Sequence, residues 1–166
     1  MADIALRHGW SPGLLGWIIA EHGRYYDREW RLGPVFEAKV AHGLGELFAR
    51  FDPARDMLLA AMNGDTVLGA IAVDGSGPDA TSQGARIRYF IISDAARGRG
   101  VGRLLLAETM RFIEAADFRR AWLTTFAGLD AARHLYETHG FRLAHEELDT
   151  SWGSPLTEQC FEWRRA

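Results

Sequence analysis

A glycine-rich turn at residues 97–102 is the feature that most constrains how this chain can fold. It reads Arg-Gly-Arg-Gly-Val-Gly, follows the apolar run 89–92 and opens an amphipathic run over 101–116. Alternate glycines allow backbone N–H groups to approach an anion closely. A helix that begins there adds unpaired N–H groups and the positive end of its dipole, and arginines donate hydrogen bonds suited to phosphate. The pattern predicts a strand, a pyrophosphate-binding turn and a helix in succession.

Two common phosphate motifs do not fit this turn. The Walker motif ends in Gly-Lys-Ser/Thr, whereas Gly102 is followed by Arg103 and Leu104. The dinucleotide fingerprint GxGxxG needs a third glycine at residue 103 or 105, where the chain has arginine and leucine. Two alternatives stay open at this point: another kind of phosphate cradle, and an ordinary strand-to-helix turn whose glycines serve only tight geometry.

The spacing resembles the acetyl-CoA pyrophosphate loop of the GNAT N-acetyltransferases, Arg/Gln-x-x-Gly-x-Gly/Ala, with Arg97, Gly100 and Gly102 in the three fixed places. Residues 131–141, Ala-Ala-Arg-His-Leu-Tyr-Glu-Thr-His-Gly-Phe, are similar to the family's A-x-x-L-Y-x-x-x-G-F segment. The resemblance covers roughly residues 57–147. It implies an α/β (α+β) fold, the GNAT acyl-CoA N-acyltransferase fold, with a mixed, mostly antiparallel sheet and helices on both faces.

The resemblance also implies roles for single residues. Tyr136 is the expected general acid that protonates the departing thiolate of CoA, although without the surrounding motif it reads more readily as a core tyrosine. Backbone N–H groups of residues 90–92 are expected to hold the thioester carbonyl and pantetheine, because in the family this strand separates from its neighbour. The turn backbone is expected to bind the pyrophosphate. The implied cofactor-binding residues are Phe90, Ile91, Ile92, Arg97, Gly98, Arg99, Gly100, Val101, Gly102 and Arg103.

The sequence offers no clear base for the acceptor amine. A lysine-like amine with a pKa of about 10.4 is neutral in only about one molecule in 10³ at pH 7. Many relatives have a glutamate on the strand before the glycine loop or on the strand after the next helix. The polar and aromatic residues found there are Arg86, Arg88, Tyr89, Thr124 and Thr125, and Leu129 replaces an asparagine that contacts the cofactor in many relatives. A water chain can serve as base, so the prediction of an enzyme stands.

The N-terminal part carries a closer resemblance, to the acetyltransferase half of bacterial proteins that fuse a MarR-type winged helix to a GNAT domain. The similar positions are Gly16-Trp17, His22-Gly23, Tyr25-Tyr26, Glu29, Phe36-Glu37, Phe51-Asp52, Trp152-Gly153 and 156–159. We expect only the catalytic half, a single domain over residues 1–166. His22, Tyr26 and Glu29 share one helical face. In the GNAT fold that the resemblance implies, this face lines the acceptor site. They are the predicted substrate-binding residues, with Glu29 or His22 to bind or deprotonate the amine; the alternative is a packed or solvated polar face.

Composition narrows the function classes. The net charge of -3 offers no basic surface for nucleic acid. A single cysteine, Cys160, excludes an internal disulfide framework. No apolar run approaches the length of a membrane span, and no signal peptide is visible, so a cytoplasmic protein without a membrane partner is expected. No His/Cys/Asp cluster has metal-ligand spacing, so no metal is expected.

Periodicity and turn signals predict the order of elements. Strands are predicted at 3–7, 57–62, 66–73, 85–92, 118–126, 141–147 and 159–164; helices at 11–30, 34–50, 101–116 and 130–139. Ser11-Pro12 is the predicted start of the first helix, which we expect to loosen near Gly23. Asn63-Gly64-Asp65 predicts a hairpin, and residues 74–84 an exposed loop.

Together these features predict an acetyl-CoA-dependent N-acetyltransferase. It would pass the acetyl group directly to a primary amine of a small molecule or peptide in a ternary complex, as a monomer or homodimer. One alternative is a non-catalytic acyl-CoA-binding regulatory module, motivated by the missing strand carboxylate and by relatives fused to regulators. A second alternative is a binder of a different nucleotide phosphate.

Overall fold

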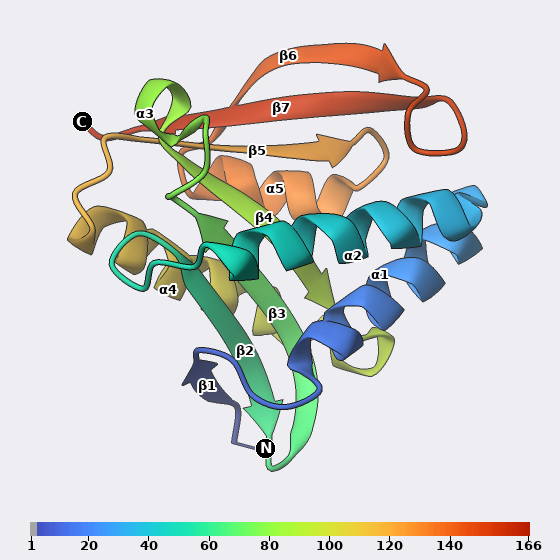
Figure 1. The fold of residues 1–166 in the computed structure, drawn as a ribbon, viewed down its shortest axis with the longest axis horizontal. Helices are drawn as coiled ribbons and strands as arrows, with labels where there is room; N and C mark the ends of the chain where they lie inside the picture. Colours follow the sequence, from blue (N-terminus) through green and yellow to red (C-terminus); the bar gives the residue numbers. More distant parts are fainter. Residues whose placement is uncertain (1–2) are drawn as a thin grey trace.

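A seven-stranded sheet in the order β1-β2-β3-β4-β5-β7-β6 forms the middle layer of the computed structural model, which describes residues 3–166 (Figure 1). The strands are β1 Ala5–His8, β2 Met57–Asn63, β3 Thr66–Asp74, β4 Ala85–Ile92, β5 Arg120–Phe126, β6 Arg142–Asp149 and β7 Leu156–Arg164. The helices are α1 Leu14–Trp30, α2 Gly33–Ala49, α3 Ala80–Gln83, α4 Val101–Ala115 and α5 Asp130–Thr138. Neighbouring strands run antiparallel except for the parallel pair β4 and β5, which confirms the predicted mixed sheet.

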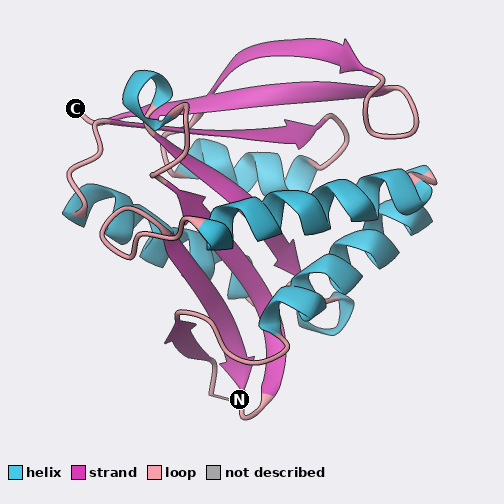
Figure 2. Ribbon diagram, in the orientation of Figure 1, coloured by secondary structure: helices cyan, strands magenta, loops and turns pink. Residues whose placement is uncertain are grey.

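Helices cover both faces of this sheet (Figure 2). On one face α1 and α2 form a hydrophobic cluster in which Leu44 packs with Leu58 of β2. On the other face α4 and α5 form a second cluster, in which Leu105 packs with Leu59. Consecutive residues of β2 face opposite layers, so the strand is apolar throughout, as expected of a strand covered on both sides. Within residues 3–166 no helix combines the length and the apolar character needed to cross a bilayer.

The parallel strands β4 and β5 separate soon after they begin. They pair only at Ala85 with Ala121 and at Arg86 with Trp122. Further along β4 the register against β3 shifts between Ala70 and Ala72, opposite a residue, Tyr89, that has a positive φ of 56°. A positive φ is unusual for an aromatic residue, and together with the register shift it marks a bulge in β4. Residues 87–92 thus have no ladder with β5, and the sheet opens into a wedge there.

The first helix differs from its prediction at two points. It begins at Leu14 rather than at Ser11-Pro12, because Gly13 is left-handed (φ 86°) and the Ser11 carbonyl accepts a turn hydrogen bond from Leu14 N at 3.1 Å. It also runs unbroken through Gly23. A Cβ atom at Gly23 would lie 2.6 Å from Glu37 Oε1 of α2. That glycine therefore permits close helix–helix approach and does not loosen the helix.

The segment 74–84, predicted as an exposed loop, is partly ordered and partly buried. Asp74 is buried and accepts hydrogen bonds from Arg50 Nη2 at 2.7 Å and Arg88 Nη1 at 3.0 Å. Burial alone would raise the pKa of Asp74, but the hydrogen bonds from the two arginines hold it below its usual range. α3 forms the single turn that follows. The last strand also starts earlier than predicted, since Leu156 is buried in the α1–α2 cluster.

Gly84 provides a test of how tightly β4 is anchored beside β5. Its φ is 86°, and a Cβ atom there would overlap the carbonyl oxygen of Arg120. Gly84→Ala should lower the free energy of unfolding by about 3 kcal/mol, because a left-handed alanine costs about 1–2 kcal/mol and the backbone clash adds a similar cost. Gly64→Ala is the matched control, with a φ of 58° and nothing within 4 Å of its Cβ. Urea titrations measure both variants, and equal losses would contradict the clash.

Candidate active site

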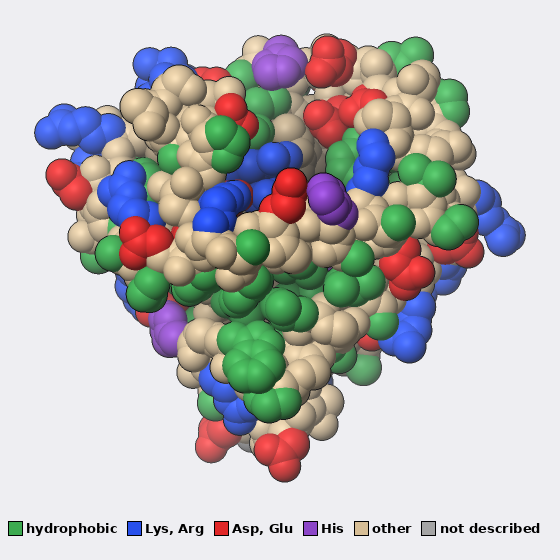
Figure 3. All heavy atoms as spheres, in the orientation of Figure 1, with side chains coloured by type: hydrophobic (Ala, Val, Ile, Leu, Met, Phe, Trp, Pro, Cys, Tyr) green, Lys and Arg blue, Asp and Glu red, His purple; other side chains and the backbone are tan. Residues whose placement is uncertain are grey.

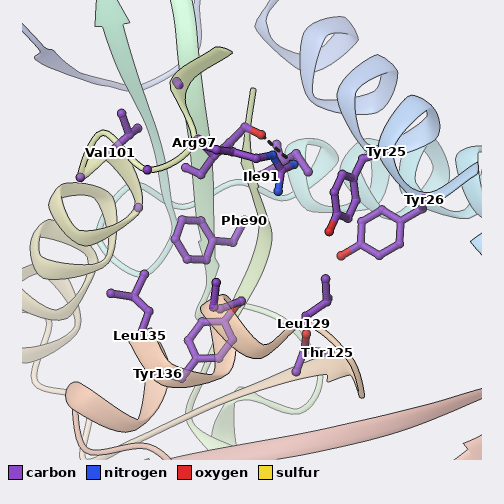
Figure 4. Close-up of a pocket in the computed structure, with 17 residues that line it drawn as sticks. Tyr25, Tyr26, Phe90, Ile91, Arg97, Val101, Thr125, Leu129, Leu135 and Tyr136 are labelled. Atoms are coloured by element: carbon purple, nitrogen blue, oxygen red, sulfur yellow. Dashed lines mark hydrogen bonds between the residues drawn. The ribbon is translucent and has the colours of Figure 1, made fainter. Parts of the chain in front are cut away.

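A cavity of about 260 Å³ occupies the wedge where β4 leaves β5, and we call it the glycine-loop cavity (Figure 4). Residues from β4, the glycine turn, α1 and α5 surround it. The predicted site residues that line it are Tyr26, Phe90, Ile91, Ile92, Arg97, Gly98, Gly100, Val101, Gly102 and Tyr136. The side chains of Arg99 and Arg103 are not part of the lining. In Figure 4 the hydroxyl oxygens of Tyr25 and Tyr26 point from α1 toward the middle of this cavity.

The glycine turn has the backbone shape that an anion cradle needs. Gly98 and Gly100 have φ values of 74° and 80°, and nothing lies within 4 Å of a Cβ built on either. Both positions therefore need glycine for backbone conformation and leave open space beside the chain. Gly100 is also the N-cap of α4, whose first N–H groups lack helical partners. Gly102 differs, since its Cβ would touch Leu135 Cδ2 of α5 at 3.3 Å.

Arg97 is held at the mouth of the cavity by three contacts. Its Nη2 donates to the Ile92 carbonyl at 3.0 Å and its Nε to Asp94 Oδ1 at 3.1 Å, while the guanidinium lies 4.2 Å from the Tyr25 ring centroid. Asp94 also accepts two hydrogen bonds from Arg28, at 2.6 and 3.1 Å. Hydrogen bonding from Arg28 holds the pKa of Asp94 below its usual range. The Arg97 guanidinium is thus held in a fixed position beside the glycine turn, with Asp94 as its partner.

Glu29 does not reach either side of this site. Its carboxylate is exposed and accepts a hydrogen bond from Arg28 Nε at 3.2 Å. It lines neither the glycine-loop cavity nor the second cavity described below. Glu29 lies about 10 Å further along the helix axis than His22, since an α-helix rises about 1.5 Å per residue. The shared face that the sequence suggested therefore brings only His22 and Tyr26 to the cavities.

Tyr136 lies in the deep wall of the glycine-loop cavity. Only 6% of the residue is exposed, and its ring packs against Phe90, Phe141 and Phe161 with centroid separations of 6.1–6.2 Å. Burial, followed by the neighbouring Tyr26, raises the pKa of Tyr136 above its ordinary value. Its phenol is therefore protonated at neutral pH, as the proposed acid must be, although burial makes it a weaker acid than an exposed tyrosine.

A second cavity of about 120 Å³ lies on the α1–α2 side of the sheet, and we call it the helix-side cavity. His22, Phe36 and Trp152 form part of its wall opposite the sheet, and β4, β5 and β7 contribute the rest. It shares Tyr26 and Thr125 with the glycine-loop cavity. The two cavities therefore meet at these two residues, beside the opening of the wedge.

His22 presents an uncharged imidazole to the helix-side cavity. Its Nδ1 lies 2.7 Å from the Ile18 carbonyl. A carbonyl can only accept, so Nδ1 carries the proton and Nε2 keeps its lone pair. Burial lowers the pKa of His22 to about 4, against the partial opposing effect of the Ile18 hydrogen bond. The ring stacks on Tyr26 at 6.0 Å and meets Tyr89 edge-on at 6.2 Å.

Glu158 of β7 is a functional candidate that sequence reasoning missed. The β5–β7 pairing sets it opposite Phe126, and its half-buried carboxylate lines the helix-side cavity. Burial raises the pKa of Glu158, although Trp152 Nε1 donates to it at 3.2 Å. In many relatives the carboxylate lies on the strand before the glycine loop or on the strand after the next helix. Here it comes from β7, which pairs with the second of these strands. No local sequence pattern predicts that pairing. Among residues 3–166 no three His, Cys, Asp or Glu side chains group as metal ligands would.

Residues 18–141 match the family model described as the acetyltransferase (GNAT) family. The ribosomal-protein-alanine N-acetyltransferase from Brucella melitensis is 18% identical with a TM-score of 0.74, over 97% of this chain and 99% of that one. The acetyltransferase of GNAT family from Streptococcus pneumoniae is 17% identical with a TM-score of 0.71, over 98% and 100%. The yncA structure from Salmonella typhimurium, with its cofactor acetyl-CoA, is 14% identical with a TM-score of 0.73, over 97% and 93%. Among curated proteins none matches the chain.

The buried neutral His22 predicts an acid-sensitive fold. The unfolded chain protonates this histidine near pH 6.5, whereas the folded protein does so only near pH 4. The unfolded state therefore binds more protons between these values, and stability should fall as the pH drops through that window, by up to about 3 kcal/mol. His22→Asn should flatten this part of the stability–pH curve. The control His42→Asn, an exposed residue of α2, should leave the curve unchanged. Urea titrations at pH 4, 5, 6 and 7 measure the effect, and parallel curves for all three proteins would contradict it.

Proposed function

The chain belongs to the acetyltransferase (GNAT) family, and we propose that it transfers the acetyl group of acetyl-CoA to a primary amine of a small molecule or peptide. The transfer is direct, with both substrates bound in a ternary complex. One observation carries this proposal: the glycine-loop cavity and the helix-side cavity meet at Tyr26 and Thr125, where the sheet opens. A donor in the first cavity and an acceptor in the second have their reacting atoms side by side.

The glycine-loop cavity suits the donor. Backbone N–H groups of residues 98–103 bind the pyrophosphate, since Gly98 and Gly100 leave open space beside the chain. Residues 90–92, which have no ladder with β5, offer backbone groups to the pantetheine arm and the thioester carbonyl. The fold similarity to yncA, solved with its cofactor acetyl-CoA, supports this choice of donor. The chemistry needs no metal.

The reaction moves one acetyl group and two protons. The amine nitrogen forms a bond to the thioester carbonyl carbon, and backbone N–H groups of β4 stabilise the negative charge that develops on oxygen. Collapse of this tetrahedral intermediate breaks the carbon–sulfur bond. Tyr136 gives its proton to the departing thiolate, and the phenolate recovers a proton from solvent after the products leave. The other proton leaves the amine as it attacks.

Glu158 is the group best suited to receive the amine proton. Its carboxylate lines the cavity that takes the acceptor, and its raised pKa strengthens it as a base. His22 is the weaker base, because burial holds its pKa near 4. Its Nε2 lone pair instead suits it to accept a hydrogen bond from the amine. Tyr26 lines both cavities where they meet and so contacts the acceptor next to the cofactor arm.

The alternative function, a non-catalytic acyl-CoA-binding regulatory module, was suggested by two observations. The first was the missing carboxylate on the two strands next to the glycine loop, and Glu158 provides a carboxylate in the helix-side cavity. The second, similarity to the acetyltransferase half of MarR fusion proteins, remains a prediction. A regulatory module would bind acetyl-CoA without releasing CoA to any amine.

Replacing the proposed acid separates these functions. Tyr136→Phe should lower kcat by about 10²- to 10⁴-fold, the usual contribution of a positioned acid. Its Kd for acetyl-CoA should change less than threefold, since the ring still fills the same wall. Free thiol release against a panel of amino acids, polyamines, aminoglycosides and lysine peptides measures the first quantity, and calorimetry the second. Unchanged turnover would remove Tyr136 from the mechanism, and acetyl-CoA binding without thiol release from the parent protein would favour the regulatory module.

A further inference from the structure

Three buried side-chain atoms lack any hydrogen-bond partner among residues 3–166, and they occur in neighbouring parts of the sheet. They are Arg86 Nε, the Tyr89 hydroxyl and Trp122 Nε1. Arg86 and Tyr89 line the helix-side cavity. Arg86 and Trp122 line a third cavity of about 180 Å³, which continues past α2. Arg86 Nε and Trp122 Nε1 can only donate, and the Tyr89 hydroxyl can donate or accept, so the two nitrogen atoms lack an acceptor.

Arg86 differs from the two arginines beside it. Arg50 and Arg88 both pair with Asp74, at 2.7 and 3.0 Å. Among residues 3–166 no carboxylate oxygen lies within 4.0 Å of the Arg86 guanidinium. Its one hydrogen bond is a long one, from Nη2 to Thr124 Oγ1 at 3.4 Å, and its guanidinium lies 4.5 Å from the Trp122 ring centroid. The side chain is held in place without its charge being neutralised.

A buried arginine without an acid is costly. Removing a guanidinium from water is compensated only when an anion and good hydrogen bonds replace the solvent. Burial, and then the like charge of Arg88, act in the same sense by lowering the pKa of Arg86, yet an arginine remains charged at neutral pH. The hollow above α2 in Figure 3 shows side chains coloured as Lys or Arg beside side chains coloured as Asp or Glu. An oxyanion from outside the chain would supply the partner that Arg86 lacks.

We propose that Arg86 binds the carboxylate of the acceptor, so that the amine acetylated by this protein is that of a free amino acid. The proposal rests on the proposed function and names its substrate class. The Trp122 ring, 4.5 Å from the guanidinium, holds Arg86 in place, and a guanidinium can pair with a carboxylate through two parallel hydrogen bonds. A polyamine or an aminoglycoside lacks this anion and would bring further positive charge against Arg86.

The two ends of the helix-side cavity match the two charges of an amino acid. Arg86 reaches Thr124 of β5, and Glu158 pairs in register with Phe126, two residues further along the same strand. Two strand residues span about 6.6 Å. A molecule whose carboxylate meets Arg86 thus directs its amine toward Glu158 and Tyr26, at the junction with the donor. A volume of about 120 Å³, against about 300–1,000 Å³ for drug-sized sites, suits an acceptor of this size.

The test compares acceptors that differ only in the carboxylate. Leucine, phenylalanine, methionine and glutamine are each measured beside their amides and the corresponding decarboxylated amines, by thiol release at saturating acetyl-CoA. For at least one side chain the parent protein should show a KM for the free acid lower than for both analogues by about tenfold to a hundredfold, the range of one charged hydrogen-bonded contact. Equal KM values for acid, amide and amine in every series that turns over would overturn the proposal.

Substitutions then assign the preference to Arg86. Arg86→Gln should raise the KM for the free acid to that of the amine, and the Kd for acetyl-CoA should change less than threefold, because Arg86 does not line the glycine-loop cavity. Arg86→Lys should restore part of the preference, because it keeps the charge without the bidentate geometry. Arg111→Gln removes an exposed positive charge from α4 and should leave the preference intact. Retention of the full preference in Arg86→Gln would overturn the assignment. If Arg86→Gln does not fold, the KM preference for the free acid is compared between Arg86→Lys and the parent protein, and an undiminished preference in Arg86→Lys would overturn the assignment.

Failure of the proposed function gives a different pattern. If no amine supports thiol release, titration calorimetry of the same amino acids and amines into the CoA-bound protein replaces kinetics. Binding of the acids alone, lost in Arg86→Gln, would keep the carboxylate site while removing the acetyl-transfer proposal. No difference in binding between acids and amines would overturn the carboxylate site itself.

Discussion

The separation of β4 from β5 is the constraint on which the rest of this molecule depends. Two parallel register pairs, at Ala85 and Arg86, hold the strands together, and the bulge at Tyr89 turns β4 away. The wedge leaves backbone groups of β4 without strand partners, which is costly unless a ligand uses them. It also opens the sheet between its two hydrophobic layers. The cavity on one face and the cavity on the other can therefore meet inside the sheet, at Tyr26 and Thr125.

What the sequence revealed about the fold and site was mainly local. The glycine turn could be predicted because its left-handed backbone needs glycine at Gly98 and Gly100, and both glycines stand within the six residues of the turn itself. The hairpin around Gly64 and the helix that carries Tyr136 are likewise set by neighbours in the chain. The start of α1 was predicted less accurately. Gly13 takes the N-cap position in a left-handed conformation, and the residue type alone does not show whether a glycine adopts that conformation.

The rest depended on contacts distant in sequence. Glu158 enters the helix-side cavity only because β7 pairs with β5, and Asp74 is buried only because Arg50 and Arg88 converge on it. The pattern of His22 and Glu29 on one helical face was sound as geometry. Positions seven apart differ in direction by only about 20°, but they are about 10 Å apart along the helix axis. Glu29 therefore lies beyond both cavities, where it pairs with Arg28.

The contrast between Arg86 and Arg88 links stability to chemistry in this site. The two residues are two positions apart on β4, yet only Arg88 pairs with Asp74, which also binds Arg50 at the end of α2 and so joins that helix to the sheet. Both arginines line the helix-side cavity together with Glu158, and Arg86 is the one that has no carboxylate partner. The proposed carboxylate of the acceptor would supply that partner, while its amine faces Glu158, so that neither charge needs a counter-ion from solvent. The cost of an unpaired arginine in the free protein is then recovered when the acceptor binds.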